Sequence, residues 1–325
     1  MIVIEPDALL ILPHLQAWNV DTISGPLTWG FPSIASFMDL QHDISRCLAN
    51  EFDVTLDGIG IISHAFDASV SRPSRGRYRV LNALQRKLGD VEYLEGVVGD
   101  GRANLEISLI LGVNNLTMTD PGDLEHFALR AWEVTNSLQL AGGHISFSGL
   151  PKPELILWPE SSERVQKVSR RIALELLPGH ALVSREGALD QRLTQLRKVH
   201  PNVNSLDVLL EFSSRRVEPL VITQNGVSDD SARTEGIEWR ARRRSARLVP
   251  IPVGYASIYP VRAAEETIDD NQSPFRFVEN LFSLGQWLSP HRVWDMRNLL
   301  WQASIDSDEG VYRFSTPFYA ADPMV

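Results

Sequence analysis

The sequence predicts an α+β protein with a ferredoxin-like, RNA-recognition-type β-α-β-β-α-β core and a mixed α/β C-terminal half. Apolar strand-like runs and helical periodicities follow one another in that order before residue 150. A long arginine-rich insertion separates the second and third strands, where a short hairpin turn is usual. We therefore expect a core at 1–150, with an inserted thumb at 71–101. We expect 151–325 to be an extension that packs on the core and on partner subunits.

The first strand and helix enclose a turn rich in glycine and proline. The apolar run Ala8–Leu15 predicts a strand, and a helical pattern begins at about Ser33. Between them, Ser24–Ser33 contains Trp29 and Phe31. Such a turn before a helix N-terminus presents backbone N–H groups, which suit an anion such as phosphate. The alternative is a packed connection whose aromatic residues cover the core. For Trp29 we favour a role in fixing the turn over one in stacking on a base.

The other core elements follow the alternation of apolar and polar residues. In the third strand, Asn104–Val113, the leucines point to one face, whereas Glu106 and Ile110 point to the other. Asp120 and Pro121 are the residue types of an N-cap and a first helical position. The remaining core elements expected are a strand at 57–70, a helix from Pro121, and a short strand at 144–147.

The C-terminal half shows shorter and less regular patterns. The expected strands are 154–158, 181–184, 248–259 and 311–315, and the expected helices are 161–177, 186–199 and 205–212. Two more helices are predicted from Ser-Pro starts at Ser273-Pro274 and Ser289-Pro290. The first would carry Phe277, Val278, Leu281 and Leu284 at helical spacing. We expect these last helices to form the surface that contacts partner subunits.

Composition and charge predict a cytoplasmic location. The formal net charge of −10 argues against non-specific nucleic-acid binding over the whole surface. A local basic site remains compatible with it, because electrostatic fields fade over about 8 Å at physiological salt. The single cysteine, Cys47, excludes an intrachain disulfide and fits a reducing compartment. No apolar run reaches the roughly 18–20 residues of a membrane span, and the N-terminus lacks a signal peptide's basic region.

The sequence carries no catalytic, metal or cofactor motif. Its eight histidines lie at least 18 residues apart, which removes the short-spaced zinc patterns. Acid–base chemistry could use His42 beside Asp43 or His64 near Asp67, but we favour surface or core packing for both histidines. We therefore predict no catalytic residue, no bound metal and no cofactor.

Arginines are concentrated in two segments. Residues 71–88 contain Arg72, Arg75, Arg77, Arg79, Arg86 and Lys87 and no acidic residue, and residues 240–247 contain Arg240, Arg242, Arg243, Arg244 and Arg247. A guanidinium matches phosphate oxygens, and an aromatic ring such as that of Tyr78 can stack on a base. A solvated loop or an acidic protein neighbour is the alternative for the first cluster, and pairing with the preceding acidic loop is the alternative for the second. The third strand lacks aromatic residues, so we do not expect RNA to stack on the open sheet.

Blocks that span nearly the whole chain resemble one protein family. They are Leu9–Pro13, Ser24–Ser33, Asp57–Ile61, Asn104–Gly112, Leu140–Gly143, Leu177–Gly179, Ala181–Glu186, Val249–Tyr255, Arg276–Phe282, Trp287–Val293 and Tyr312–Pro317. In type and order they are similar to the second Csy subunit of the type I-F CRISPR surveillance complex, a member of the Cas-five superfamily. This assembly is also called the Csy complex or type I-F Cascade. The segments 71–101 and 213–247 match least.

The resemblance implies a non-catalytic subunit that binds CRISPR RNA in RNA-guided defence against foreign DNA. It would pair with the large subunit, hold the 5′ handle of the RNA, and lie next to the first backbone subunit. Target DNA is a further candidate contact. The insertion at 71–101 stands where relatives have a thumb-like projection. The alternatives are a metal-independent endoribonuclease that acts on CRISPR repeat RNA and a scaffold that binds protein only.

The RNA contacts are expected from the turn, the thumb and a second tier of arginines. The turn would bind the handle through backbone N–H groups, with an aromatic side chain beside a base. The thumb would clamp phosphates, and the second tier would face RNA or the large subunit. The candidate residues are Ser24, Gly25, Leu27, Thr28, Trp29, Phe31, Ser33, Arg72, Arg75, Arg77, Tyr78, Arg79, Arg185, Arg242 and Arg244.

Overall fold

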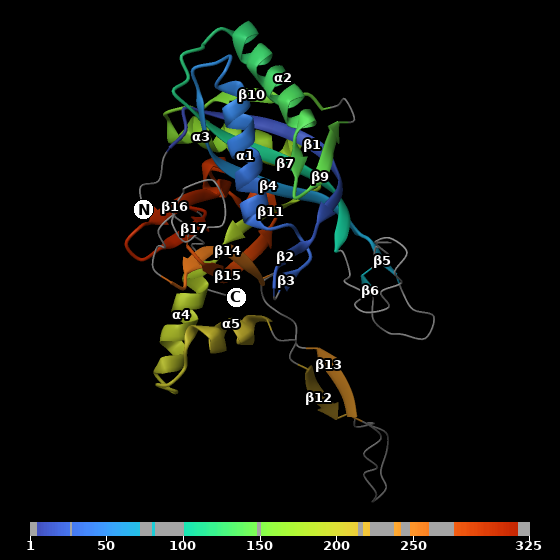
Figure 1. The fold of residues 1–325 in the computed structure, drawn as a ribbon, viewed down its shortest axis with the longest axis vertical. Coiled ribbons are helices and arrows are strands. Elements are labelled where there is room, and N and C mark those ends of the chain that lie inside the picture. Colours follow the sequence, from blue (N-terminus) through green and yellow to red (C-terminus); the bar gives the residue numbers. More distant parts are fainter. Residues whose placement is uncertain are drawn as a thin grey trace, which may run out of the picture.

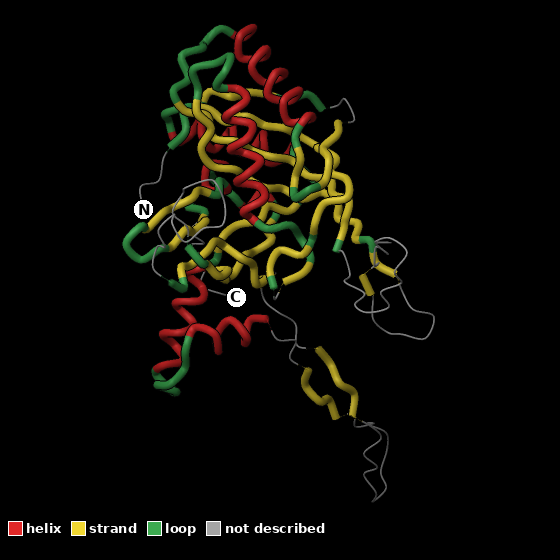
Figure 2. Tube along the Cα trace, in the orientation of Figure 1, coloured by secondary structure: helices red, strands yellow, loops and turns green. Residues whose placement is uncertain are grey.

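A computed structural model describes residues 5–26, 28–71, 80–81, 101–147, 151–213, 217–221, 237–241, 248–259 and 276–317. The predicted α+β class is confirmed: these residues form an 11-stranded antiparallel sheet, three small two-stranded sheets and five α-helices. Figure 2 shows the strands of the large sheet gathered in one curled layer, with helices lying against it and projecting from one end. Among the described helices, none is both long and apolar enough to cross a membrane.

The N-terminal part of the sheet contains the predicted succession of elements. These are β1 (Ala8–Asp21), α1 (Ile34–Leu48), β4 (Thr55–Ala68), β7 (Arg102–Asn114), α2 (Pro121–Ser137) and β9 (Gly143–Phe147), and the strands lie in the order β4-β7-β1-β9. The first strand is longer than the predicted Ala8–Leu15. Its register against β7 shifts at two bulges, where His14 and Asn19 adopt positive φ of 50° and 58°. The bulges let pairing continue past the proline at position 13 to Asp21.

The two faces of this sheet carry separate apolar cores. On the first face, α1 and α2 cover the leucines of β7, as the alternation of residues predicted. On the second face, Ile110 packs with Leu9 and Ile62. Helix α3 (Ser162–Glu175) and the short 3-10 helices η2 (Pro290–Arg292) and η3 (Met296–Leu299) cover these residues. Figure 1 shows α1 and α2 in front of the strands and α3 behind them.

Strands from the C-terminal half extend the same sheet. They are β10 (Glu154–Leu157), β11 (His180–Ser184), β14 (Leu248–Ser257), β15 (Val278–Leu288), β16 (Gln302–Asp306) and β17 (Val311–Ser315). The full order is β16-β17-β14-β15-β11-β4-β7-β1-β9-β8, with β8 at Gln139–Leu140 and β10 paired to β1 beside β9. Strands that precede residue 150 and strands that follow it in the sequence therefore belong to one sheet. Helices α4 (Glu186–Arg197) and α5 (Ser205–Ser213) project from the end that carries β14 and β15 (Figure 1).

Two predicted helices are corrected by the structure. The apolar residues from Phe277 to Leu284 belong largely to strand β15, which pairs with β14 on one side and β11 on the other. Their spacing also fits a helix, and only the two long-range partners select a strand. After Ser289 the chain forms the 3-10 helices η2 and η3 instead of an α-helix. Strand β16, which pairs with β17, was not predicted.

The insertion leaves the sheet between β4 and β7, which pair directly with each other. The short strands β5 (Val70–Ser71) and β6 (Val80–Leu81) pair at its base. Strands β12 (Val217–Val221) and β13 (Ile237–Ala241) form another two-stranded sheet. The arginine-rich residues 72–79 and 242–247 lie outside the described residues, so the predicted thumb contacts stay predictions.

Candidate nucleic-acid interface

The turn between β1 and α1 is a small β-hairpin. Strands β2 (Ile23–Gly25) and β3 (Thr28–Trp29) pair antiparallel, and the Ser24 hydroxyl donates to Thr28 Oγ1 at 2.9 Å. The N–H of Gly30 donates to the carbonyl of Thr22 at 2.9 Å. Gly30 has a φ of 141°, a conformation that L side chains rarely adopt. The hairpin is therefore closed by its own hydrogen bonds, and Leu27 at its tip lies outside the described residues.

The two aromatic residues of the hairpin segment have different environments. Phe31 stacks on Phe37 of α1, with ring centroids 5.6 Å apart, and meets the edge of Trp287 at 4.9 Å. Trp29 is 48% exposed, and Cδ1 of its ring lies beside Gly101. Phe31 therefore packs the turn onto α1, and the role in fixing the turn that the sequence analysis favoured for Trp29 stays a prediction. The exposed indole of Trp29 is free to meet a ligand.

Helix α1 begins at the residue predicted for it. Ser33 is the N-cap, and its Oγ accepts the N–H of Ser36 at 3.3 Å. The two serine hydroxyls are themselves 3.0 Å apart. The first turn contains no acidic residue, so the partial positive charge of the helix N-terminus is not neutralised there.

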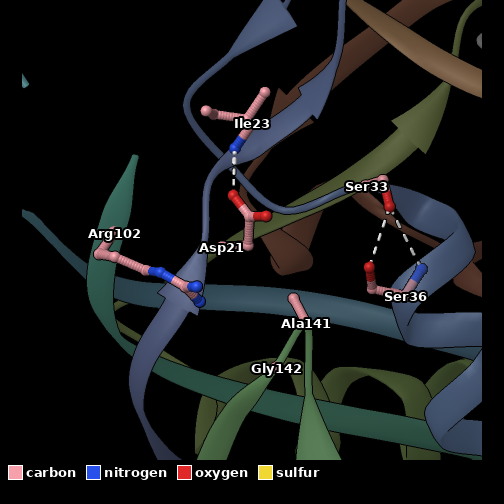
Figure 3. Close-up of a pocket in the computed structure, with 7 residues that line it drawn as sticks. All are labelled: Asp21, Ile23, Ser33, Ser36, Arg102, Ala141 and Gly142. Atoms are coloured by element: carbon pink, nitrogen blue, oxygen red, sulfur yellow. Dashed lines mark hydrogen bonds between the residues drawn. The ribbon is translucent and has the colours of Figure 1, made fainter. Parts of the chain in front are cut away.

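A pocket of about 240 Å³ opens between the hairpin and α1 (Figure 3). It is lined by Asp21, Ile23, Ser33, Ser36, Arg102, Ala141 and Gly142. The Arg102 side chain extends toward Asp21, and its Nη1 donates to the carbonyl of Asn19 at 3.2 Å. Among the described residues, Arg102 has no ion pair with a carboxylate, and Oδ1 of Asp21 accepts the N–H of Ile23 at 2.8 Å. The lining thus offers the guanidinium of Arg102 and the carboxylate of Asp21 opposite the start of a helix.

Sequence analysis did not select Arg102 or Ser36. Arg102 lies just after the insertion, at the start of a strand. The alternation of apolar and polar residues in this strand does not distinguish Arg102 from the other polar residues. Its place beside α1 follows from the pairing of Arg102 with Asp21, which depends on the bulge at Asn19. Ser36 could have been found, because a serine three residues after an N-cap serine faces the same turn of the helix.

Arg185 was selected from the sequence, and the structure places it outside this pocket. It stands at the N-cap of α4, with no side-chain capping bond, and its N–H donates to the carbonyl of Leu284 at 2.8 Å. Burial lowers the pKa of its guanidinium. Its Nε is buried without a hydrogen-bond partner among the described residues. The neighbouring Glu186 pairs with Arg313 at 2.8 Å, so it does not neutralise Arg185.

Strand β15 connects the hairpin with Arg185. A Cβ added to Gly25 would lie 2.9 Å from the Asn280 amide and 3.5 Å from the Phe282 ring, so the hairpin packs closely on β15. Arg185 bonds to Leu284, two residues further along the same strand. The structure therefore brings together Ser24, Gly25, Thr28, Trp29, Ser33 and Arg102, and it joins them to Arg185 through β15. The predicted sites Leu27, Arg72, Arg75, Arg77, Tyr78, Arg79, Arg242 and Arg244 lie outside the described residues.

The described side chains include no group of three or more His, Cys, Asp and Glu residues that could hold a metal ion. The chemistry that the interface offers is anion binding, through Arg102, Arg185 and the start of α1. An exposed indole at Trp29 accompanies these groups.

Comparison with known proteins gives two consistent findings. The family described as CRISPR-associated protein (Cas_Csy2) matches residues 10–314. A relative named CRISPR-associated protein Csy2, from Pseudomonas aeruginosa (strain UCBPP-PA14), is 40% identical over 324 residues, covering 98% of each chain. The match includes both the hairpin and Arg185.

Proposed function

This chain belongs to the Csy2 family of CRISPR-associated proteins, and we propose that it is a non-catalytic RNA-binding subunit of the type I-F complex. In this proposal it pairs with the large subunit, lies beside the adjacent backbone subunit in the cytoplasm, and holds the 5′ handle of the CRISPR RNA. The arginines of the insertion would clamp phosphates close to the handle.

The observation that carries the proposal is the guanidinium of Arg185, whose Nε is buried without a hydrogen-bond partner among the described residues. A cation that is withdrawn from water and lacks a counter-charge destabilises the folded state. A phosphate group would supply both the missing charge and acceptors for the donors of the guanidinium. Burial also lowers the pKa of Arg185, because withdrawal from water disfavours the charged form of the guanidinium.

The pocket beside α1 supports the same function. Arg102 has no ion pair with a carboxylate among the described residues, and it faces the N-terminal turn of α1, which contains no acidic residue. Helix N-termini with a nearby cation are favourable positions for phosphate. Trp29 lies on the hairpin next to this pocket and is 48% exposed, which suits it to stacking on an unpaired base.

We also assign the core to the ferredoxin-like class. The support is the strand order β9-β1-β7-β4, in which the fourth, first, third and second strands of the unit lie side by side and antiparallel. In this arrangement the insertion leaves the sheet between the second and third strands, where we place the thumb.

The test uses the assembled complex. Arg185→Ala and Arg102→Ala are expected to weaken retention of the RNA and to lower the slope of its salt dependence by about 0.7 per lost phosphate contact. The matched control is Arg46→Ala, because Arg46 is an exposed arginine already paired with Asp43 at 2.9 Å. Retention that is unaltered in both variants would contradict the proposal and favour a protein scaffold. Cleavage of repeat RNA by the purified chain alone would favour an endoribonuclease.

A further inference from the structure

The second face of the sheet changes character at the His14 bulge. Before the bulge, Leu9 and Ile11 of β1 are buried in the core covered by α3. After it, the residues of β1 on this face are His14, Gln16 and Trp18. Trp18 is 41% exposed and His14 and Gln16 are half-buried, so this half of the face reaches solvent.

The neighbouring strand β7 adds polar residues to the open half. Gln16 pairs with Glu106 in the ladder, and paired residues share a face. Asn104 follows on the same side, because alternate residues of a strand point to the same face. We call His14, Gln16, Trp18, Asn104 and Glu106 the polar platform.

The histidine of the platform is held in a fixed orientation. His14 Nδ1 lies 2.7 Å from Oε1 of Glu106, and its ring stacks on that of His64, with centroids 4.2 Å apart. His64 is itself bonded at both ring nitrogens, to the carbonyl of Pro178 and to Oγ of Ser108, each at 2.7 Å. His14 therefore uses Nδ1 for the carboxylate and leaves Nε2 without a hydrogen-bond partner among the described residues.

The indole of the platform is also pre-positioned. Trp18 Nε1 donates to Oγ of Ser146 on the adjacent strand β9 at 2.9 Å. This bond satisfies the only polar atom of the ring and limits its rotation. A rigid, partly exposed indole loses little entropy when it stacks on a planar group.

The chemistry of the platform selects a nucleobase over a phosphate or a protein surface. It contains no lysine or arginine to bind a phosphate, and the bond from His14 holds the pKa of Glu106 below its usual range, so Glu106 is an acceptor group at neutral pH. Carboxylate, amide and imidazole groups instead match the donors and acceptors on base edges. A docked protein would need a largely apolar centre, and Trp18 is the single large apolar side chain of the platform.

The platform is continuous with the proposed phosphate site. Oδ1 of Asn104 accepts the N–H of Asn19 at 3.0 Å, and the carbonyl of Asn19 accepts Nη1 of Arg102 at 3.2 Å. Asn104 and Arg102 are two residues apart on β7, about 7 Å along the strand. This distance is comparable to the spacing of nucleotides in an extended strand. A chain whose phosphate is bound at Arg102 could thus place its neighbouring base over Trp18.

We propose that the polar platform binds an unpaired base of the CRISPR RNA, with Trp18 as its stacking surface and His14, Gln16, Asn104 and Glu106 along its edge. This inference rests on the proposed function. It also revises the expectation that RNA avoids the sheet, because β1 supplies the aromatic residue that β7 lacks.

The test measures the affinity of the assembled complex, reconstituted with RNAs that carry single abasic nucleotides across the handle. Trp18→Ala should weaken binding of intact RNA about tenfold, because stacking on one base contributes about 1–3 kcal/mol. One abasic position should cause the same loss in the wild-type complex and no further loss in Trp18→Ala. Trp18→Phe should retain most of the affinity. The control is Leu174→Ala, since Leu174 is a large apolar side chain that is 58% exposed on α3.

The outcomes separate this inference from the proposed function. Suppose that Arg102→Ala weakens binding, but every abasic position lowers the affinity of the Trp18→Ala complex as much as that of the wild-type complex. The platform proposal is then wrong, and the RNA-binding role stands. If DNA of the same sequence depends equally on Trp18, the commitment to RNA is wrong. If the wild-type complex retains no RNA, both proposals fail. Thermal unfolding should show that Trp18→Ala remains folded with a modest loss of stability, because the ring is 41% exposed and its bond to Ser146 is lost.

Discussion

On the second face of the large sheet, the same strands are covered by helices in one half and reach solvent in the other half. Near one end, Leu9, Ile62 and Ile110 are fully buried beneath α3 and the 3-10 helices. Near the other end, β1 and β7 present the polar platform. The boundary is the bulge at His14, where β1 shifts its register. A single strand can therefore stabilise the fold along one stretch and carry recognition groups along the next. Apolar residues at alternate positions mark the first stretch, and polar residues at alternate positions mark the second.

The comparison predicts its largest effect in the covered half. Ile110→Ala should lower the free energy of unfolding by about 2–5 kcal/mol, because it leaves a cavity in a closely packed core. The folded fraction should keep its affinity for RNA. Gln16→Ala, on the open half of the same face, should change stability by less than about 0.5 kcal/mol. Urea denaturation of both variants measures the difference, and equal losses would show that the two halves are not distinct.

The next effect concerns the two aromatics of the hairpin segment. Phe31→Ala should cost about 2–3 kcal/mol of stability, somewhat less than a fully buried phenylalanine, since its ring is packed between Phe37 and Trp287. Trp29→Ala should leave stability nearly unchanged and weaken retention of RNA. Thermal unfolding combined with an RNA-binding measurement tests both statements. The reverse pattern would return Trp29 to the role of fixing the turn.

The smallest effect concerns His64, which stacks on His14 at the boundary between the two halves. It makes the stability of the protein depend on pH. Burial lowers the pKa of His64 in the folded protein below its ordinary value of 6.5. As the pH falls below about 6.5, the unfolded chain therefore takes up this proton more readily than the folded chain, and stability is lost. Above that pH both states are neutral at this residue and no penalty exists. His64→Gln should lose less stability than the wild type between pH 6.5 and 5, measured by urea denaturation at each pH; identical curves would contradict the assignment.

Local sequence signals predicted much of the fold. The N-caps at Ser33 and Asp120, and the alternation of residues in β7, gave the order of the core elements because each signal depends on neighbours within a few residues. Strand β15 was mistaken for a helix because its two partners, β11 and β14, are distant in the sequence. The nearby 3-10 helices have no strong periodicity of their own.

The candidate site was predictable only where it is local. The turn and the helix start could be predicted from glycine, proline and serine, whereas the pairing of β2 with β3 was not predicted. The stacking of His14 on His64 could not, because the two residues lie on strands separated by β7 and meet only once two bulges have set the register. Arg102 likewise reaches the pocket through the pairing of distant strands.

The central claim is that RNA runs along the edge formed by the end of β1, the β2–β3 hairpin and the start of β7. The most direct measurement is ultraviolet crosslinking of the assembled complex, loaded with 4-thiouridine-containing RNA, followed by mass spectrometry of the crosslinked peptides. We predict crosslinks from handle nucleotides to peptides that contain Trp18, Trp29 and Arg102. Crosslinks that join the handle to other subunits, and to none of these peptides, would contradict the account.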